Sequence, residues 1–203
     1  MRPGLRRVRE QSKDLSLAVE RHEGNVGHHQ RVGFLVATVA KAMDLPDPVL
    51  LGEAAELHDL GKLGISASVL RKPGPLSVAE RKLIGAHPRA GYDRLMQLAM
   101  PARGAAREYW QTAATIALRH HERYDGRGYP DGLAGEEIPL IARIVHGCDV
   151  YDALTSRRAY REALSPALAI RALTQDAGSF DPDVLRILLD VGIPACLSLA
   201  PAD

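Results

Sequence analysis

The sequence predicts an all-α fold, a compact helical bundle with a metal site between helices and an additional helix at the N-terminus. Apolar residues recur at intervals of three and four along most of the chain, which is the period of an α-helix. Helix start signals precede several of these runs, and neither an alternating strand pattern nor an internal repeat is present. Histidines and aspartates also lie on the apolar faces, where a buried ionisable group needs a partner or a metal ion.

Composition limits the domain count and the class of partner. A chain of 203 residues with 46% hydrophobic content can bury one core, so we expect one domain. The net charge of +1 provides no basic field that would attract duplex nucleic acid or an acidic membrane. No apolar run approaches the roughly 20 residues of a membrane span, and the N-terminus is too polar for a secretory signal. We therefore expect a cytoplasmic location, and the two cysteines form no disulfide framework.

The N-terminal segment has a weak heptad pattern. Leu5, Val8, Leu15 and Val19 approximate an apolar seam that Ser12 interrupts. Five basic residues are mixed with it: Arg2, Arg6, Arg7, Arg9 and Lys13. The segment is either a solvated helix laid on the core or a dimer-forming signalling helix. The expected organisation is thus a helix over residues 1–22 and a domain over residues 23–203.

The first two helices of the domain should carry three of the ionisable groups. One helix begins near His28, and its apolar face continues through Val32, Leu35, Val36, Val39 and Met43. Asp47 is positioned to cap the next helix, and Pro48 suits its first turn. That helix should run to about Leu60, which would place His58 and Asp59 on its last turn.

The middle of the chain should form two more helices and a long loop. Ser77 and Glu80 have the spacing of a capping box, and one stripe follows at Leu83, Ile84, His87, Gly91 and Leu95. A helix over about residues 107–122 should end in His120 and His121. Residues 123–137 contain four glycines and a proline, and loops of about this length are often functional.

The C-terminal part should form three helices. The first follows Pro139 and carries Ile141, Val145, Cys148, Asp149 and Asp152 on one side. Two carboxylates therefore share an otherwise apolar stripe. The other two helices are indicated by the pairs Ser165-Pro166 and Asp181-Pro182.

The adjacent residues His58 and Asp59 favour metal chemistry. Neighbouring side chains on a helix diverge by about 100° and can hold two sides of one metal, while a carboxylate can bridge two ions. His120 and His121 repeat this arrangement with imidazoles, and Asp149 offers another carboxylate. Such ligands suit manganese, iron or zinc. Two ions about 3.5–4 Å apart would activate a shared hydroxide and stabilise charge at phosphorus, as phosphodiester hydrolysis requires.

Four separated motifs stand out along the chain: HDLGKLGI (58–65), KPGPLS (72–77), HHERYDGRGYPDGLAGEEIPLIARI (120–144) and DVYDALTSRRAYR (149–161). They resemble the motifs of the HD-GYP family and occur in the family's order. Both name-giving motifs are intact, His58-Asp59 and Gly128-Tyr129-Pro130. The resemblance covers about residues 25–190 and implies an HD-domain helical bundle. Members of the family typically hydrolyse the bacterial messenger cyclic di-GMP.

The resemblance implies two divalent transition-metal ions, iron or manganese first, with zinc also compatible. The implied ligands are His28, His58, Asp59, His87, His120, His121 and Asp149. Asp59 would bridge an ion on His28, His58 and Asp149 and an ion on His87, His120 and His121. His28 is assigned rather than His29 because it lies three residues before Arg31, as in the family. His29 is assigned to the surface or the outer shell of the site.

The resemblance also implies which residues contact the substrate. Lys62 takes the position of the lysine that touches the scissile phosphate, so Lys62 and Asp59 are the implied catalytic residues. Three further residues would contact the dinucleotide phosphates: Tyr129, Arg158 and Arg161. Asp152 would lie near a guanine or its hydrogen-bonding partners. The structural alternative for each is ordinary surface or capping chemistry.

Two departures from the family pattern matter. Some relatives have a glutamate four residues before the first histidine and use it for a third metal, whereas this chain has Gly24 there, with Glu23 beside it. We therefore expect two metals. The usual arginine-proline-tyrosine-arginine run has alanine at its second position, Ala159, which keeps both charges.

The function implied is hydrolysis of cyclic di-GMP through a metal-bridging hydroxide, giving linear pGpG and, on continued hydrolysis, GMP. One alternative is action on another cyclic dinucleotide, such as the mixed GMP-AMP ring. A second is a nucleotide-sensing or adaptor module with little turnover. The partners expected are cyclic di-GMP, a second copy of the chain through the N-terminal helix, and signalling proteins through the loop over residues 123–137, called the GYP loop.

Overall fold

The computed structural model describes residues 5–156 and 162–198, and every regular element in these residues is helical, as predicted. The α-helices are α1 (Leu5–Glu23), α2 (His28–Ala42), α3 (Pro48–Ala55), α4 (Ala67–Leu70), α5 (Val78–Gly85), α6 (His87–Ala99), α7 (Gly104–Arg119), α8 (Leu140–Thr155), α9 (Pro166–Gln175), α10 (Pro182–Ile187) and α11 (Ile193–Leu197). Short helical turns of other periods are η1 (Leu60–Gly64), η2 (Gly135–Glu137), η3 (Ala177–Ser179) and η4 (Leu188–Gly192).

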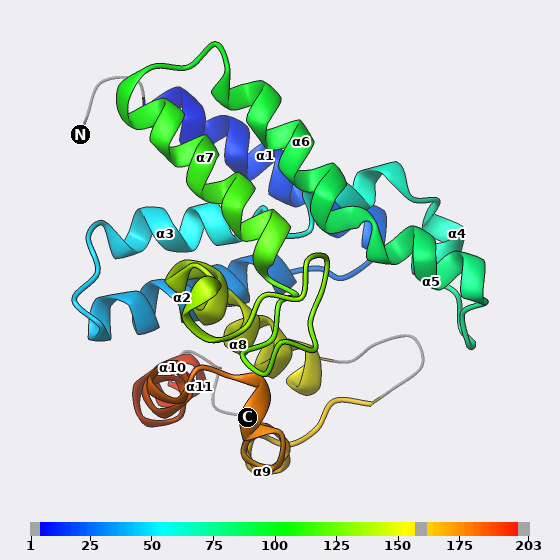
Figure 1. Cartoon of the computed structure of the whole chain (residues 1–203), viewed down its shortest axis with the longest axis vertical. Helices are drawn as coiled ribbons and strands as arrows, with labels where there is room; N and C mark the ends of the chain where they lie inside the picture. Colours follow the sequence, from blue (N-terminus) through cyan, green and yellow to red (C-terminus); the bar gives the residue numbers. More distant parts are fainter. Residues whose placement is uncertain (1–4, 157–161, 199–203) are drawn as a thin grey trace.

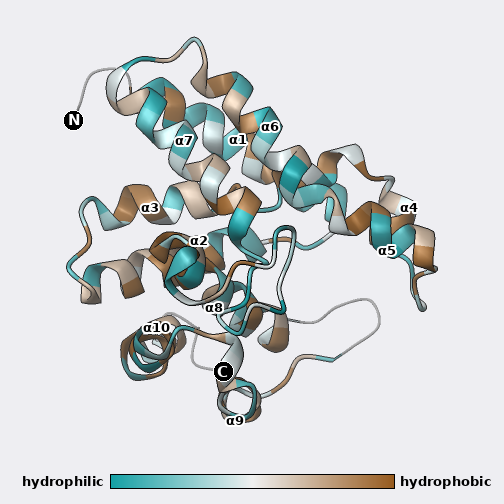
Figure 2. Ribbon diagram, in the orientation of Figure 1, coloured by the Kyte–Doolittle hydropathy of each residue, from teal (hydrophilic) through white to brown (hydrophobic). Residues whose placement is uncertain are grey.

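The core lies around α2 (Figure 1), which packs against α3, α8 and the C-terminal elements η4 and α11. The α6–α7 pair covers another side, and η1 packs against α6. Hydrophilic and hydrophobic residues alternate around several of the helices (Figure 2), as expected where one face of a helix packs on a core. Fully buried side chains at the centre include Leu35, Leu57, Leu60, Leu95, Ile116 and Ile144.

Helix α1 shares this core. Leu5, Val8 and Val19 are buried in the same hydrophobic cluster as the residues of α2 and α7. The helix contacts α3, α7 and η1, which is the arrangement of a helix laid on the bundle. Most of its expected seam is therefore covered within one chain, and dimerisation through α1 stays a prediction.

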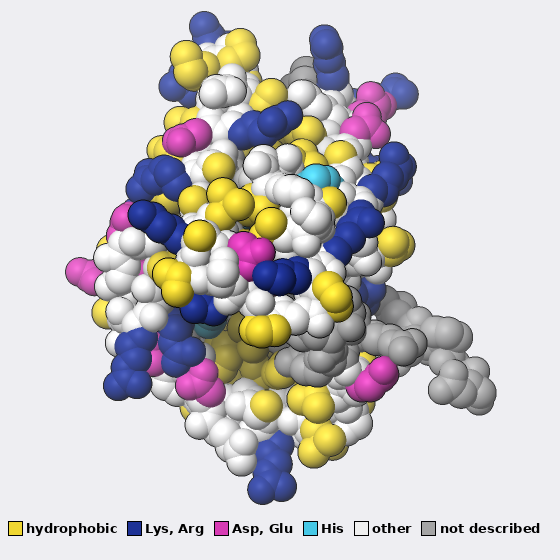
Figure 3. All heavy atoms as spheres, turned by 90° about the vertical axis from the view of Figure 1, so that its right-hand side faces the viewer, with side chains coloured by type: hydrophobic (Ala, Val, Ile, Leu, Met, Phe, Trp, Pro, Cys, Tyr) yellow, Lys and Arg dark blue, Asp and Glu magenta, His cyan; other side chains and the backbone are white. Residues whose placement is uncertain are grey.

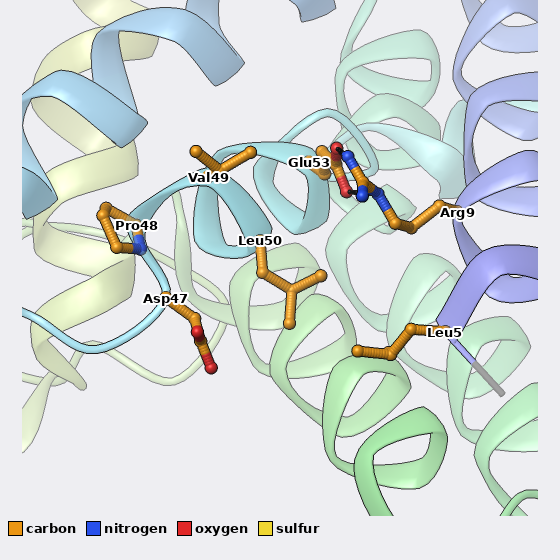
Figure 4. A pocket seen from close by; sticks show the side chains of 7 residues that line it. All are labelled: Leu5, Arg9, Asp47, Pro48, Val49, Leu50 and Glu53. Carbon is orange, nitrogen blue, oxygen red and sulfur yellow. Dashed lines mark hydrogen bonds and ion pairs between the residues drawn. The ribbon is translucent and has the colours of Figure 1, made fainter. Parts of the chain in front are cut away.

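A groove of about 450 Å³ lies between the N-terminal ends of α1 and α3 (Figure 4). Its lining residues are Leu5, Arg9, Asp47, Pro48, Val49, Leu50 and Glu53, none of which is an implied ligand. Arg9 donates to Glu53 at 2.7 Å across it. On the face in Figure 3, basic and acidic side chains are interspersed rather than gathered in a patch of one sign.

Three of the four helix starts predicted from capping residues are confirmed. Ser77 and Glu80 form a reciprocal capping box at α5, and the side chains of Ser165 and Asp181 cap α9 and α10. The prediction for Asp47 is wrong in its chemistry. The residue does precede α3, but its φ of 49° is left-handed and its side chain makes no capping hydrogen bond.

The predicted helix end near Leu60 is also wrong. Helix α3 ends at Ala55, and His58 and Asp59 lie beyond it in tighter turns, where Leu57, His58, Leu60 and Lys62 each donate to the carbonyl three residues earlier. The tightening continues into η1. Gly61 lies where η1 meets α6. A Cβ at Gly61 would lie 2.0 Å from the His87 carbonyl oxygen, so the backbone of η1 rests directly on the start of α6.

Two further helices also end earlier than predicted. The stripe expected on one helix from Leu83 to Leu95 is divided between α5 and α6, because Pro88 opens a new first turn behind His87. Helix α7 ends at Arg119, so His120 and His121 follow it instead of lying on its last turn. Four of the implied ligands, His58, Asp59, His120 and His121, thus follow the last residue of a helix. No helix in the described residues combines the length and apolarity needed to cross a bilayer.

Candidate metal centre

The seven implied ligands come from elements that are distant in the sequence and lie together in the fold. His28 comes from the first turn of α2, His87 from the first turn of α6, and Asp149 from the middle of α8. The pairs His58-Asp59 and His120-His121 come from the turns after α3 and α7. Five of the seven are at most 3% exposed: His28, His58, Asp59, His87 and His120. That these residues bind metal stays a prediction.

Four of the histidines are oriented in the same way. In each ring Nδ1 is held by an oxygen atom of the protein, and Nε2 faces the centre. The partners are Asp152 Oδ2 for His28 (2.7 Å), the Ala55 carbonyl for His58 (2.9 Å), the Ile84 carbonyl for His87 (2.7 Å) and the Ala117 carbonyl for His120 (3.0 Å). Such contacts turn Nε2 of each ring toward the centre and suit a neutral ring that would ligate a metal through Nε2.

Asp59 lies between two groups of donors. Its Oδ2 is 3.3 Å from His58 Nε2, and its Oδ1 is 3.1 Å from His87 Nε2 and 3.6 Å from His120 Nε2. Two clusters with metal-binding spacing share this carboxylate: His28, His29, His58 and Asp59, and Asp59, His87, His120 and His121. Asp149 adds an oxygen 3.4 Å from His28 Nε2 and 3.8 Å from His58 Nε2.

Burial and neighbouring charges shift the pKa values of several groups in the centre. Burial favours the neutral forms of His120 and His121, lowering the pKa of His120 to about 4 and that of His121 well below its usual value. Burial acts on His58 in the same way, but the Asp59 carboxylate outweighs it and raises the His58 pKa to about 9. Burial would raise the pKa of Asp59, yet Lys62 and His58 hold it well below its usual value. Burial would also raise the pKa of Asp149, yet His58 and His28 hold it below its usual value, so both carboxylates stay ionised.

Unpaired atoms provide the test of whether a metal fits. His58 Nε2 and Asp59 Oδ1 are buried and make no hydrogen bond, although both aim at the centre. An orphaned buried acceptor costs free energy unless a ligand satisfies it. Nitrogen and carboxylate donors that converge on one point suit a transition metal. The donor set of this site therefore fits metal ions.

Asp152 is fully engaged within the protein. It is 2% exposed, accepts from Arg31 Nε at 2.6 Å and from Ser156 Oγ at 3.0 Å, and holds His28 through its Nδ1. The arrangement is that of a carboxylate that orients a metal-ligating histidine. Its implied contact with a guanine stays a prediction. Arg31, which anchors this carboxylate, has a role that the sequence did not reveal.

The GYP loop packs on His121. A Cβ at Gly128 would lie 2.3 Å from the Arg123 nitrogen and 2.5 Å from the His121 carbonyl oxygen, so only glycine permits this approach. The Tyr129 N–H then donates to the same carbonyl at 3.2 Å. The Tyr129 ring stacks on the His121 ring with centroids 4.7 Å apart and planes 21° apart. The loop thus fixes a candidate ligand, and 38% of Tyr129 remains exposed.

Glu122 was not identified from sequence. Although only 1% exposed, it accepts from the Asp131 N–H at 2.9 Å and the Leu133 N–H at 3.1 Å, and Arg119 pairs with it at 3.2 Å. It therefore ties the far side of the GYP loop to the end of α7. Nothing in its spacing distinguishes it from a surface glutamate after His121.

The remaining predicted residues have mixed outcomes. Lys62 lies against Asp59, its ammonium 2.5 Å from Oδ2. His29, expected at the surface or in the outer shell, is fully buried beside the centre. Arg158 and Arg161 lie outside the described residues. Their predicted phosphate contacts stay predictions.

Comparisons with known proteins identify the family of this chain. Residues 15–184 match the family described as HD domain. The Xanthomonas campestris pv. campestris protein named cyclic di-GMP phosphodiesterase response regulator RpfG is 43% identical over 187 residues, 90% of this chain and 48% of that protein. A Vibrio cholerae protein named 3'3'-cGAMP-specific phosphodiesterase 3 is 40% identical over 166 residues, 80% of this chain and 34% of that protein. The chain spans half or less of these relatives' lengths.

A solved structure resembles the fold. It is described as Bd1817, a HDG"Y"P protein from Bdellovibrio bacteriovorus, with 23% identity and a TM-score of 0.62 over 80% of this chain and 50% of that one. The resemblance to HD-GYP proteins predicted from the motifs is confirmed. With its paired His58-Asp59 at the centre of a helical bundle, the chain belongs to the HD-domain family.

Proposed function

We propose that this chain is a metal-dependent phosphodiesterase that hydrolyses cyclic di-GMP, either to pGpG alone or through pGpG to GMP. The observation that carries the proposal is the placement of Asp59, whose two oxygens face two separate groups of histidines. A shared carboxylate is the arrangement that holds two ions close together. The name of the RpfG relative supports cyclic di-GMP as the substrate.

The residues of the site would divide the work. When bound, two ions would supply Lewis-acid stabilisation of the phosphate and an activated water. His28, His58 and Asp149 would hold one ion, and His87, His120 and His121 the other, with Asp59 between them. Lys62 would place a positive charge beside the phosphate oxygens, where charge builds up during hydrolysis. The partly exposed Tyr129 would meet the substrate at the rim.

The first prediction concerns metal content. The chain purified without oxygen should contain two transition-metal ions, iron or manganese, with zinc also compatible, because two donor clusters share one carboxylate. Elemental analysis against protein concentration measures this directly. A third ion at full occupancy, or full activity of the metal-free chain, would contradict the two-ion proposal.

The second prediction concerns the substrate. The metal-loaded chain, incubated with cyclic di-GMP, should release pGpG first and GMP later, as resolved by product chromatography. Parallel incubations with 3'3'-cGAMP and cyclic di-AMP give the ratio of kcat/KM values that defines specificity. We expect cyclic di-GMP to have the highest value.

One alternative has its own support. The relative named as specific for 3'3'-cGAMP is nearly as similar to this chain as RpfG is, so a higher kcat/KM for that ring would reassign the substrate within the same chemistry. An adaptor that binds cyclic di-GMP with little turnover is the other alternative. Tight binding measured by calorimetry, without product over the same period, would favour it.

A further inference from the structure

We propose that Glu23, which lies in none of the four matched motifs, is a positioning residue for Lys62. The inference rests on the proposed function, because Lys62 is the group assigned to the phosphate. Glu23 ends α1, and Lys62 lies in η1. The contact therefore joins the N-terminal helix to the turn that carries Asp59.

The ammonium of Lys62 lies between two carboxylates. Its Nζ is 2.8 Å from Glu23 Oε1 and 2.5 Å from Asp59 Oδ2. The side chain of Glu23 is 9% exposed and that of Lys62 is 20% exposed. Little water competes for this pair, so its geometry is better defined than that of a surface ion pair.

The pairing matters because the ammonium of Lys62 has a limited number of N–H donors. Lysine has three N–H donors and no acceptor. Two of them are directed at Glu23 and Asp59, which leaves one for a phosphate oxygen beside the metal centre. Without Glu23, four flexible methylene groups would let the ammonium turn away, so Glu23 limits it to one orientation.

The surroundings of Glu23 hold it in place. The fully buried ring of His29 has its Nε2 3.7 Å from Glu23 Oε2, and this nitrogen makes no hydrogen bond. The other ring nitrogen, Nδ1, lies 3.3 Å from Ser16 Oγ. Glu20, one helical turn before Glu23, accepts from the His29 backbone N–H at 3.0 Å. Polar contacts thus connect Glu20 of α1, through His29, to Glu23, which pairs with Lys62.

The opposing interpretation is that Glu23 and His29 hold a cation of their own. His29 has the right spacing to His28, His58 and Asp59. The position between Glu23 and Asp59 is, however, already occupied by the Lys62 ammonium, and a divalent ion there would have to displace it. The two interpretations differ in metal content and in the dependence of Glu23 on Lys62.

A double-mutant cycle tests the inference. Glu23→Gln, Lys62→Met and the double variant are compared in the metal-loaded full chain for kcat, KM, metal content and melting temperature. Glu23→Gln should lower kcat by about 10–100-fold, the usual effect of losing an outer partner at such a site, and leave the metal content unchanged. It should cause little further loss when Lys62 is already methionine. The melting temperatures should be non-additive in the same way.

Glu20→Gln is the matched control, because it removes a buried carboxylate from the same helix that contacts His29 but not Lys62. Its effect should add to that of Lys62→Met. The inference is overturned if the effects of Glu23→Gln and Lys62→Met also add, or if Glu23→Gln loses an ion. If the wild-type chain hydrolyses no cyclic dinucleotide, the proposed function fails and the positioning role fails with it. If turnover is normal and the cycle is additive, the positioning role alone fails.

Discussion

Asp59→Ala is expected to abolish turnover and to release metal from both halves of the centre. The Asp59 oxygens face His58 on one side and His87 with His120 on the other, so one substitution removes a donor from each cluster. The loss should exceed the 10²–10³-fold typical of a single electrostatic contact, because the ions that supply the chemistry are themselves lost. Kinetics and elemental analysis of the same preparation measure both effects.

Lys62→Ala provides the comparison. It removes the charge assigned to the phosphate but no candidate ligand, so we expect about a 10²–10³-fold loss of kcat with near-normal metal content. Asp59→Asn separates charge from volume, because the amide keeps the shape and weakens the bridge. Retention of both ions and of the wild-type rate in Asp59→Ala would show that the centre lies elsewhere.

The fold class and the candidate ligands could largely be predicted from the sequence. Helix spacing, helix start signals and sequence motifs are all read from neighbouring residues. The three-and-four spacing after His28 and the Asp181-Pro182 start each depend on a few neighbouring residues. The motif resemblance then assigned ligands that the structure does bring together, including Asp149 from a helix about 90 residues after His58 and Asp59. Periodicity alone could not have paired those helices.

The helix ends were the weaker part of the prediction, for a physical reason. Residues 56–60 contain neither glycine nor proline, so local sequence does not end α3 at Ala55. The close contact of Gly61 with the start of α6 is tertiary, and local spacing does not encode it. Likewise, Glu23 and Glu122 resemble ordinary surface glutamates in sequence. Glu23 is shielded because α1 packs against η1, and Glu122 is buried because the GYP loop folds over it. Single-sequence spacing encodes neither contact.

The close approach at Gly61 leads to a prediction about the site that changes no ligand. An added methyl group in Gly61→Ala would lie 2.0 Å from the His87 carbonyl oxygen and 2.6 Å from the Gly91 nitrogen. Both are backbone atoms, which cannot rotate away as a side-chain tip can. We expect a loss of about 3 kcal/mol, the upper end for overpacking, and a fall in melting temperature of roughly 6–12 °C. Calorimetry of the metal-loaded chain measures it.

Gly64→Ala is the matched control, since it lies in the same turn, η1, and an added Cβ there meets nothing within 4 Å. It should change stability by less than about 1 kcal/mol. The two variants also separate stability from chemistry. In the wild-type chain, Asp59 Oδ1 lies 3.1 Å from His87 Nε2. Moving η1 away from α6 would lengthen this distance, so Gly61→Ala should bind metal more weakly even at temperatures where it is folded. Equal metal affinity and equal melting temperatures in the two alanine variants would mean that the contact between η1 and α6 does not hold the two halves of the centre together.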